Sequence, residues 1–384
     1  MKKSILLTTI LAVFVLAFAA CGDNAIPAAQ PQVAATAPVE TPAPPAPTPA
    51  AAEEPEAVER PREWVTVTDF NGNVVQVQQN PTRVAIKDNG ILDMLYAVGF
   101  ERTGIEWLIV PTRETLPDAI SWFRPDGDSA NTDINIHTGG TLFYVDWDVL
   151  DIVQPELVIL GARSFAMNRD GDRHGDDATA QFRADTEARY ANTQFIRLTI
   201  NARDSDLLND MRNNAYVLAQ IFTEIGDDLM ALVDEIEAEM NAIAEITSAL
   251  DYRAIFVMMT QPTALSVFVE NSRFDMIFEE FGFNAVDIDV SAFADQHGFD
   301  ARAEFLLQIN PDVIFLLDRT EADGWGAATD NFMADPIIQR TNAFVNGHIY
   351  SGLPTGEWYT VVGGINSARR MIEDVNRFIE NLNN

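Results

Sequence analysis

Alternating and helical patterns of apolar residues divide the chain into strands and helices from residue 64 onward. Two short strands are predicted on either side of a turn at Asn71-Gly72-Asn73, by the valines Val65, Val67, Val74, Val75 and Val77. A strand over 83–86, a helix over 91–98 and a strand near 103–107 are predicted next. This alternation of strands and helices is typical of α/β construction.

Longer apolar patterns follow in the second half of the chain. Helices are predicted over 206–222 and 227–250, and the second carries apolar residues at spacings of three and four: Leu229, Leu232, Val233, Ile236, Met240, Ile243 and Ile246. A strand over 254–259, a helix beginning near Ser272-Arg273-Phe274 and a closing amphipathic helix over 364–382 complete the pattern. The long helix over 227–250 is suited to joining two lobes rigidly.

Two segments 156 residues apart repeat one arrangement. In the first, Asp148 precedes Pro155 by seven residues and Arg163 follows it by eight, around the apolar run 157–160. In the second, around the apolar run 313–317, the same three positions are Glu304, Pro311 and Arg319. Each copy reads as a short acidic helix that leads through proline into a buried strand, with an arginine beyond it.

The two arginines indicate where a ligand is expected. In open α/β sheets ligands bind beyond the carboxyl ends of the strands. Arg163 and Arg319 would project there from opposite lobes into one cleft. Guanidinium groups keep their charge and present a planar fork of donors, so a facing pair suits a polyanion. The alternative is two ordinary surface arginines.

We therefore predict two α/β lobes, each a three-layer sandwich, joined by one long rigid bridging helix, with the ligand cleft between the lobes. The predicted boundaries are a signal peptide over 1–20, a lipidated cysteine and linker over 21–61, an N-terminal lobe over 62–224, a bridging helix over 225–250 and a C-terminal lobe over 251–384.

The first residues are typical of an export signal. Met1-Lys2-Lys3 precedes an apolar run that ends in Ala19-Ala20, directly before Cys21. Small residues before a cysteine indicate lipidation of Cys21, although Phe18 replaces the usual leucine. A plain secreted protein with a stray cysteine is the alternative. The Ala-, Pro- and Thr-rich stretch 25–60 would then be a semi-rigid tether to the membrane.

Composition excludes several classes of function. The formal net charge of −33 argues against nucleic acid, since phosphate binding needs a broad basic face. Cys21 is the only cysteine, which leaves no intramolecular disulfide, cysteine-based zinc site or iron–sulfur cluster. Motifs typical of hydrolases, NTPases and dinucleotide enzymes are missing, so we do not expect an enzyme.

An acidic stretch over 168–189 follows Arg163 and includes arginines as well. It is expected to form a long loop that crowds or gates the cleft. Its spacing resembles a calcium loop beginning at Asp170, but Gln181 stands where that loop needs glutamate. Calcium binding there is the weaker alternative.

The chain resembles siderophore-binding proteins of ABC importers, especially the branch that binds catecholate and petrobactin-type chelates. The matching stretches cover most of residues 64–382: Val65-Thr66-Val67-Thr68-Asp69, Arg83-Val84-Ala85-Ile86, Gly140-Thr141-Leu142-Phe143, Asn271-Ser272-Arg273-Phe274, Asn310-Pro311-Asp312-Val313-Ile314-Phe315, Asp318-Arg319-Thr320, Asn346-Gly347-His348-Ile349-Tyr350, Glu357-Trp358-Tyr359 and Gly363-Gly364. The second lobe matches best, and the order of the motifs makes the resemblance fairly specific.

The resemblance implies roles for individual residues. Arg163, Arg273 and Arg319 would contact the anionic ferric chelate, and His297 and Tyr359 would ligate its iron where the chelator leaves coordination sites open. Phenolate and imidazole are competent ligands for ferric iron. It also implies a monomer with no permanent cofactor, which delivers the ferric siderophore to an ABC permease and its ATPase. The docking carboxylates for that permease would be Asp148 and Glu304.

Other readings of the sequence remain. Haem and cobalamin receptors share the broad fold, and the three arginines weigh against both. A manganese or zinc receptor usually assembles several histidines, but the four histidines lack ligand spacing: His137, His174, His297 and His348. An enzyme with an unmarked site and a surface adhesion protein are the more distant alternatives.

Overall fold

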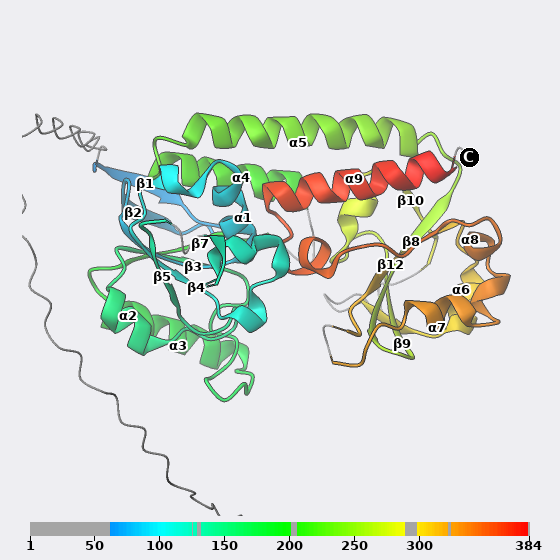
Figure 1. Ribbon diagram of the computed structural model, residues 1–384, viewed down its shortest axis with the longest axis horizontal. Coiled ribbons are helices and arrows are strands. Elements are labelled where there is room, and N and C mark those ends of the chain that lie inside the picture. Colours follow the sequence, from blue (N-terminus) through cyan, green and yellow to red (C-terminus); the bar gives the residue numbers. More distant parts are fainter. Residues whose placement is uncertain are drawn as a thin grey trace, which may run out of the picture. The chain divides into compact units, whose positions relative to one another are not determined.

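The computed structural model describes most of the chain from residue 62 onward (Figure 1): residues 62–124, 126–128, 132–200, 206–288, 298–321 and 324–382. The predicted signal peptide, Cys21, the linker and His297 lie outside the described residues. No helix in the described ranges is both long and apolar enough to cross a membrane.

The folded part begins with the predicted hairpin. Strands β1 (Trp64–Thr68) and β2 (Val74–Gln78) pair antiparallel, with Val67 opposite Val75. Gly72 takes a φ of 80° in the turn, a conformation that glycine adopts without strain. The hairpin packs on helix α4 (Leu207–Ile221).

The first lobe contains a five-stranded parallel sheet in the order β5-β4-β3-β6-β7. Its strands are β3 (Arg83–Lys87), β4 (Trp107–Val110), β5 (Asn135–Thr138), β6 (Leu157–Leu160) and β7 (Gln194–Arg197). Helix α1 (Asn89–Ala97) packs with one face of the sheet, and α2 (Trp147–Val153) and α3 (Asp176–Arg189) pack with the other. Both faces are therefore covered, as parallel sheets require.

The second lobe contains a mixed sheet in the order β11-β9-β8-β12-β13, with β10 also paired to β8. Its strands are β8 (Arg253–Gln261), β9 (Ala264–Phe268), β10 (Asn284–Ala285), β11 (Phe299–Ala301), β12 (Val313–Asp318) and β13 (Ile349–Tyr350). Helices α6 (Ala303–Ile309), α7 (Thr329–Ala334) and α8 (Asn342–Val345) belong to this lobe. Unlike the first sheet, this one includes antiparallel pairs at β9.

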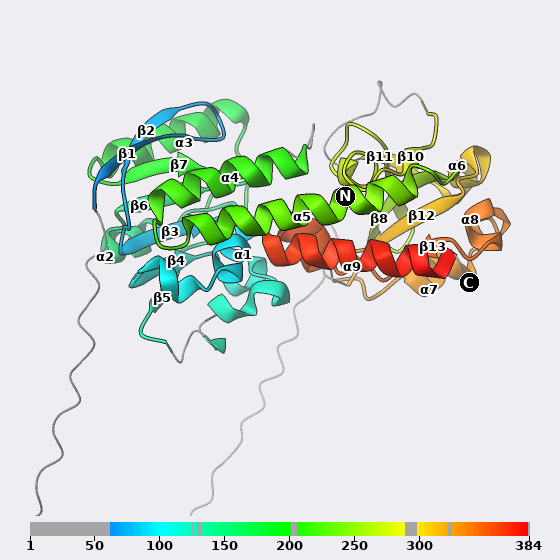
Figure 2. The same cartoon turned by 90° about the horizontal axis from the view of Figure 1, so that it is seen from above.

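Helix α5 (Gly226–Thr247) links the two sheets and is the predicted bridge. Helices α4 and α9 (Ile365–Leu382) pack along it, as seen from above in Figure 2. The start of α9 is tied back to the first lobe, because the buried Asp93 of α1 accepts a hydrogen bond from the Ser367 backbone at 3.1 Å. The fold is thus two α/β lobes joined by a long helix, as the sequence predicted.

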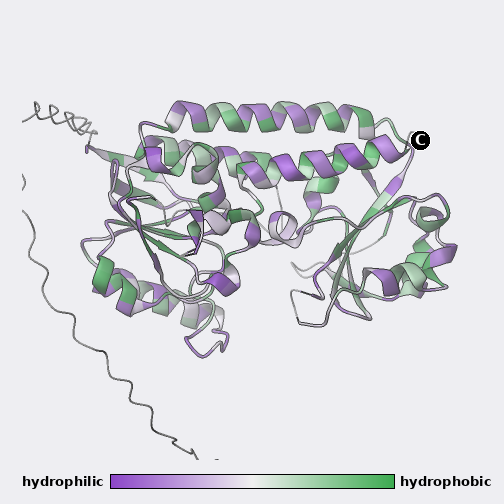
Figure 3. Ribbon diagram, in the orientation of Figure 1, coloured by the Kyte–Doolittle hydropathy of each residue, from purple (hydrophilic) through white to green (hydrophobic). Residues whose placement is uncertain are grey.

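Apolar residues dominate the central strands of both sheets (Figure 3). Successive residues of a strand point to opposite faces of the sheet and so belong to different hydrophobic cores. In β3, Val84 and Ile86 join a core shared with α5 and α9, whereas Ala85 faces α2. In β12, Phe315 joins the shared core and Ile314 faces the opposite side, where Leu306 of α6 is buried. One continuous core therefore runs along the bridging helices, and each lobe has a second core on its far face.

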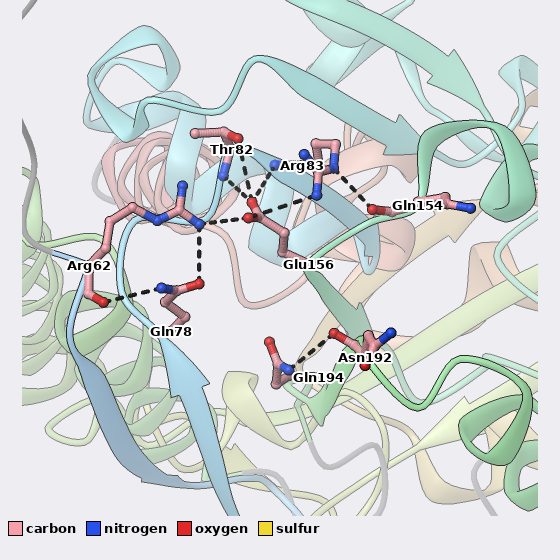
Figure 4. Close-up of polar contacts among 8 residues, drawn as sticks. All are labelled: Arg62, Gln78, Thr82, Arg83, Gln154, Glu156, Asn192 and Gln194. Carbon is pink, nitrogen blue, oxygen red and sulfur yellow. Dashed lines mark hydrogen bonds and ion pairs between the residues drawn. The ribbon is translucent and has the colours of Figure 1, made fainter.

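The repeated arrangement recurs in three dimensions. Helices α2 and α6 end at Gln154 and Asn310, whose φ angles of 48° and 46° are both left-handed. Each helix is followed by proline and a parallel strand beside the central strand of its sheet. In the first copy, Glu156 accepts hydrogen bonds from the Thr82 and Arg83 backbones at 2.7 and 3.2 Å (Figure 4).

Three predicted elements differ from those observed. The strand expected near 103–107 begins only at Trp107, because a short 3-10 helix and the left-handed Gly104 precede it. The helix expected near Ser272 is instead a 3-10 turn over Asp275–Ile277. The stretch 168–189, expected as a loop, contains the 14-residue helix α3.

The remaining short elements connect the strands and helices. They are the 3-10 helices η1 (Phe100–Thr103), η2 (Arg113–Thr115), η3 (Asp118–Phe123), η5 (Asp275–Ile277) and η6 (Ile338–Arg340), and the π-helix η7 (Gly356–Thr360). A single π-helical turn is rare and occurs often at functional sites. The π-helical conformation of η7 therefore suggests that a functional site lies at this segment.

Candidate functional site

Arg163 and Arg319 follow equivalent strands of the two lobes. Arg319 comes directly after β12, and its backbone N–H donates to Met259 at the end of β8 at 2.9 Å. Arg163 lies three residues beyond β6 in a turn where the Ser164 hydroxyl accepts from the Gly161 backbone at 3.1 Å. Both side chains therefore start from the carboxyl edge of a sheet.

Tyr359 lies in the π-helix η7, where its neighbour Trp358 is fixed in the protein interior. The Trp358 indole donates to the buried carboxylate of Asp374 at 2.9 Å, and the Tyr350 hydroxyl donates to the same carboxylate at 3.0 Å. Arg370 and Arg377 pair with Asp374 as well, at 3.1 and 3.2 Å. This buried carboxylate holds the segment that presents Tyr359.

Arg273 reaches the same point from the turn after β9. Asn271 begins the turn with a φ of 58°, and its backbone N–H donates to Asp275 at 3.0 Å. The Arg273 guanidinium donates to the backbone oxygen of Tyr359 at 3.0 Å. That bond joins the Arg273 turn directly to the π-helix.

The three predicted arginines converge on the ring of Tyr359. The guanidinium carbons of Arg273 and Arg319 lie 3.7 and 3.8 Å from the ring centroid, and that of Arg163 lies 5.9 Å away. Each contact is a cation–π interaction, which contributes about 0.5–2 kcal/mol depending on desolvation. The structure thus brings Arg163, Arg273 and Arg319, which the sequence analysis named as ligand-binding residues, together around one aromatic ring.

The electrostatics of the cluster favour an anionic ligand. Burial lowers the pKa of Arg273 to about 10; the Tyr359 side chain opposes this, and the charges of Arg163 and Arg319 add to it. Burial raises the pKa of Asp88, although hydrogen bonds and the charge of Arg163 oppose that shift. Like charges gathered in a partly desolvated place repel one another, so an anion that enters relieves that repulsion.

Two cavities adjoin the cluster and meet at Thr360. A cavity of about 210 Å³ is lined by Arg163, Arg173, Arg273 and Tyr359, among others. A cavity of about 570 Å³ on the other side has a mixed charged lining of three arginines and three acids: Arg113, Arg124, Arg319, Glu114, Asp118 and Glu357. These volumes suit a small-molecule ligand that contacts both lobes.

The other predicted site residues have the following places. Asp148 and Glu304 are both exposed in the first turns of α2 and α6, at matching positions in the two lobes. His297 is outside the described residues, so its distance from Tyr359 is not part of this geometry. Within the described ranges, no three His, Cys, Asp or Glu side chains gather as a metal site would require.

Sequence reasoning missed three arginines that line the two cavities: Arg113, Arg124 and Arg173. Arg173 belongs to the stretch predicted to crowd the cleft, and its presence in the lining agrees with that position. Arg113 begins η2 and Arg124 directly follows η3, and helices this short leave no periodic apolar pattern in the sequence.

Comparison with known proteins decides the family. The family model described as "Periplasmic binding protein" matches residues 84–354, which is more than half of the chain. The chain belongs to the periplasmic binding protein family. Proteins of this family bind substrates for transport, and the two-lobed fold agrees with membership.

Two characterised proteins are similar in sequence to this chain. The chain is 26% identical to the petrobactin-binding protein YclQ of Bacillus subtilis over 324 residues, covering 83% of this chain and 89% of YclQ. It is 25% identical to the ferric-anguibactin-binding protein FatB of Vibrio anguillarum over 179 residues, covering 45% and 54%.

Solved structures show the same fold. The crystal structure of YclQ matches with a TM-score of 0.68 at 24% identity, covering 83% of this chain and 99% of YclQ. The catecholate-siderophore-binding protein VctP of Vibrio cholerae matches with a TM-score of 0.67 at 22% identity, covering 82% and 100%. The two lobes and their long helix are therefore a shared architecture.

Proposed function

We propose that this protein is an extracytoplasmic receptor that captures a catecholate-type ferric siderophore and delivers it to an ABC importer. The observation that carries the proposal is the convergence of Arg163, Arg273 and Arg319 on Tyr359 beside two cavities. A ferric catecholate complex is a compact polyanion, and guanidinium groups bind such ligands through charge-assisted hydrogen bonds. The petrobactin- and anguibactin-binding relatives support the same ligand class.

The roles of the site residues follow from this function. The arginines neutralise the complex, and the Tyr359 phenolate and the His297 imidazole complete the coordination of iron when the chelator is tetradentate. No reaction follows binding, so the protein acts by capture and release and is not an enzyme. It carries no permanent cofactor.

The remaining features serve delivery. Asp148 and Glu304, exposed at matching positions, dock onto basic residues of the permease, whose ATPase drives transport. Residues 1–20 direct export, Cys21 carries the lipid, and the linker 21–61 holds a monomeric receptor near the membrane. The lobes would span 62–224 and 251–384, with the bridge over 225–250.

Titration of the mature protein with ferric catecholates, ferric hydroxamates, haem and cobalamin, followed by tryptophan fluorescence, tests the proposal. Ferric catecholates should bind most tightly. Arg163→Gln should weaken that binding more than tenfold, since a hydrogen bond to a charged group contributes about 1.5–3 kcal/mol. Arg340→Gln, an exposed arginine of the second lobe, is the matched control and should bind like the wild type. Binding of haem or cobalamin alone would refute the proposal.

The same titrations with Tyr359→Phe examine coordination of iron. With a tetradentate chelator, the wild type should show a phenolate-to-iron charge-transfer band that the variant lacks. The arginines should still hold the anionic complex, so weaker binding without loss of all affinity is expected. An unchanged absorption spectrum would remove Tyr359 from the iron coordination while leaving the arginine site intact.

A further inference from the structure

A third cavity lies within the first lobe, next to the arginine cluster, and its charged lining is basic. It has a volume of about 470 Å³, and its charged and ionisable lining residues are Arg173, His174, Arg183 and Arg197. We call it the side pocket. It shares Ala162, Ala166 and Arg173 with the 210 Å³ cavity that Tyr359 lines, so a ligand bound there lies against the same wall.

A structured loop and a helix form the wall of the side pocket. Asn168 accepts hydrogen bonds from the Asp170 and Asp172 backbones at 3.0 and 2.9 Å, which closes a tight turn. The returning chain pairs with the outgoing one, since the His174 backbone donates to Ala166 at 2.9 Å. These bonds hold the backbone of Arg173 and His174 at one side of the pocket.

Helix α3 and strand β7 provide the other arginines. Arg183 of α3 uses its Nε to pair with Glu187 at 2.7 Å, and the helix packs through Phe182 against Phe165 and Trp147. Arg197, at the end of β7, donates from one Nη to the backbone oxygen of Ala162 at 2.9 Å. The basic groups thus come from three separate segments anchored by packing.

Two buried nitrogen atoms of the side pocket are left without partners. Arg197 Nε and His174 Nε2 make no hydrogen bond with any described residue, although both atoms are buried. Buried polar atoms nearly always have a partner, and one without a partner destabilises the fold. Burial and the nearby Arg183 also lower the pKa of Arg197, while Asp69 and Asp88 oppose that shift. Arg197 Nε is a donor, so an acceptor that reaches it from the side pocket would satisfy it.

We propose that the side pocket binds a carboxylate group beside the ferric chelate. A carboxylate is planar, accepts two parallel hydrogen bonds from the Nε and Nη edge of an arginine, and fits among several guanidinium groups. The group is carried either by an arm of the chelate itself or by a separate small acid. The first source rests on the proposed function, and the second does not.

Two synthetic bis-catecholate chelators that differ only in a linker carboxylate or its primary amide separate these cases. By titration calorimetry of the mature protein, the ferric carboxylate chelate should bind at least tenfold more tightly than the ferric amide chelate. Arg183→Gln and Arg173→Gln should each reduce that preference several-fold. Arg169→Gln removes the same charge from the same loop, outside the pocket lining, and should leave the preference unchanged.

Succinate alone is the third probe. If it binds the wild type and not Arg183→Gln, while the two chelates bind equally, the carboxylate comes from a separate acid and the pocket assignment stands. Equal binding of both chelates together with no succinate binding would overturn the assignment. So would a preference that Arg173→Gln and Arg183→Gln leave intact. Failure of both chelates to bind the wild type would instead count against the siderophore function, and succinate would still test the pocket.

Discussion

The two copies of the helix–proline–strand unit are alike up to the end of the strand and differ immediately beyond it. Helices α2 and α6 end in the same left-handed conformation, and an acid after the proline, Glu156 or Asp312, accepts a hydrogen bond from the first residue of the central strand. Both strands then lead to an arginine. The shared part builds the scaffold and brings each arginine to the sheet edge.

Beyond the strands, the copies fix their arginines by different means. In the second lobe, Asp318 precedes Arg319 and accepts hydrogen bonds from Thr320, Ala328 and Thr329. In the first lobe, the equivalent residue is Ala162, whose backbone donates to the Thr199 hydroxyl at 3.2 Å. The second arginine is held by a side-chain network, whereas the first stands beside an open basic pocket.

Replacing Asp318 with alanine would place in the second lobe the residue type that the first lobe has at the equivalent position, Ala162. Asp318→Ala should reduce the free energy of unfolding by about 2–4 kcal/mol, since several donors lose a charged acceptor. It should also weaken ferric catecholate binding, because the turn that starts Arg319 loses its order. Chemical denaturation and fluorescence titration measure the two effects.

The exposed acid Asp330 of α7 provides the control for this change. Asp330→Ala removes the same charge and should alter the free energy of unfolding by less than about 0.5 kcal/mol. Equal effects of the two substitutions would show that the Asp318 network does not hold the turn.

Substitution of the acid that follows each proline tests whether the helix–proline–strand unit is stabilised equally in the two lobes. Glu156 accepts from two backbone N–H groups and pairs with Arg62 (Figure 4). Asp312 accepts from one backbone N–H and from the side chains of Arg253 and Asn342. At neutral pH, Glu156→Ala should therefore lower the free energy of unfolding by about 2 kcal/mol and Asp312→Ala by about 1 kcal/mol, as measured by chemical denaturation.

The pH dependence of these two costs has a definite sign. Burial raises the pKa of each acid, but hydrogen bonds from Arg62 or Arg253 and from backbone N–H groups outweigh it and hold both pKa values below their ordinary values. A lowered folded pKa stabilises the protein above the unfolded pKa, and the effect is lost as the pH falls through the folded pKa. The loss of stability caused by Glu156→Ala and by Asp312→Ala should therefore become smaller at acidic pH. Glu106 is exposed, so Glu106→Ala should change the free energy of unfolding little at any pH. Costs that grow in acid would contradict this account.

This comparison also shows what the sequence could predict. The two lobes, the bridging helix and the repeated unit were predicted because apolar periodicity and a repeat with a constant offset report directly on buried faces. The shared location of Arg163 and Arg319 was predicted because the carboxyl ends of strands place them at sheet edges. Arg273 and Tyr359 came from the family resemblance.

The parts that the sequence did not predict depend on contacts between distant segments. Helix α3 is polar along most of its length, and it is held by Phe182 packing against Trp147, which periodicity does not register. The side pocket joins the 173–174 turn, Arg183 and Arg197, which share no motif. The role of Asp374 in fixing Trp358 likewise depends on a contact that is visible only in the folded chain.

The smallest expected effect concerns the left-handed residues that end α2 and α6. A left-handed conformation costs most residues about 1 kcal/mol, whereas glycine adopts it freely and asparagine tolerates it. Gln154→Gly should therefore stabilise the protein by about 0.5 kcal/mol, since Arg83 bonds only the backbone oxygen of Gln154. Asn310→Gly should instead destabilise it by about 1 kcal/mol, because the Asn310 side chain accepts from the Asn342 backbone at 2.7 Å. Opposite signs in thermal denaturation would show that one backbone geometry is stabilised differently in the two lobes, and equal signs would mean that the Asn310 side chain contributes nothing.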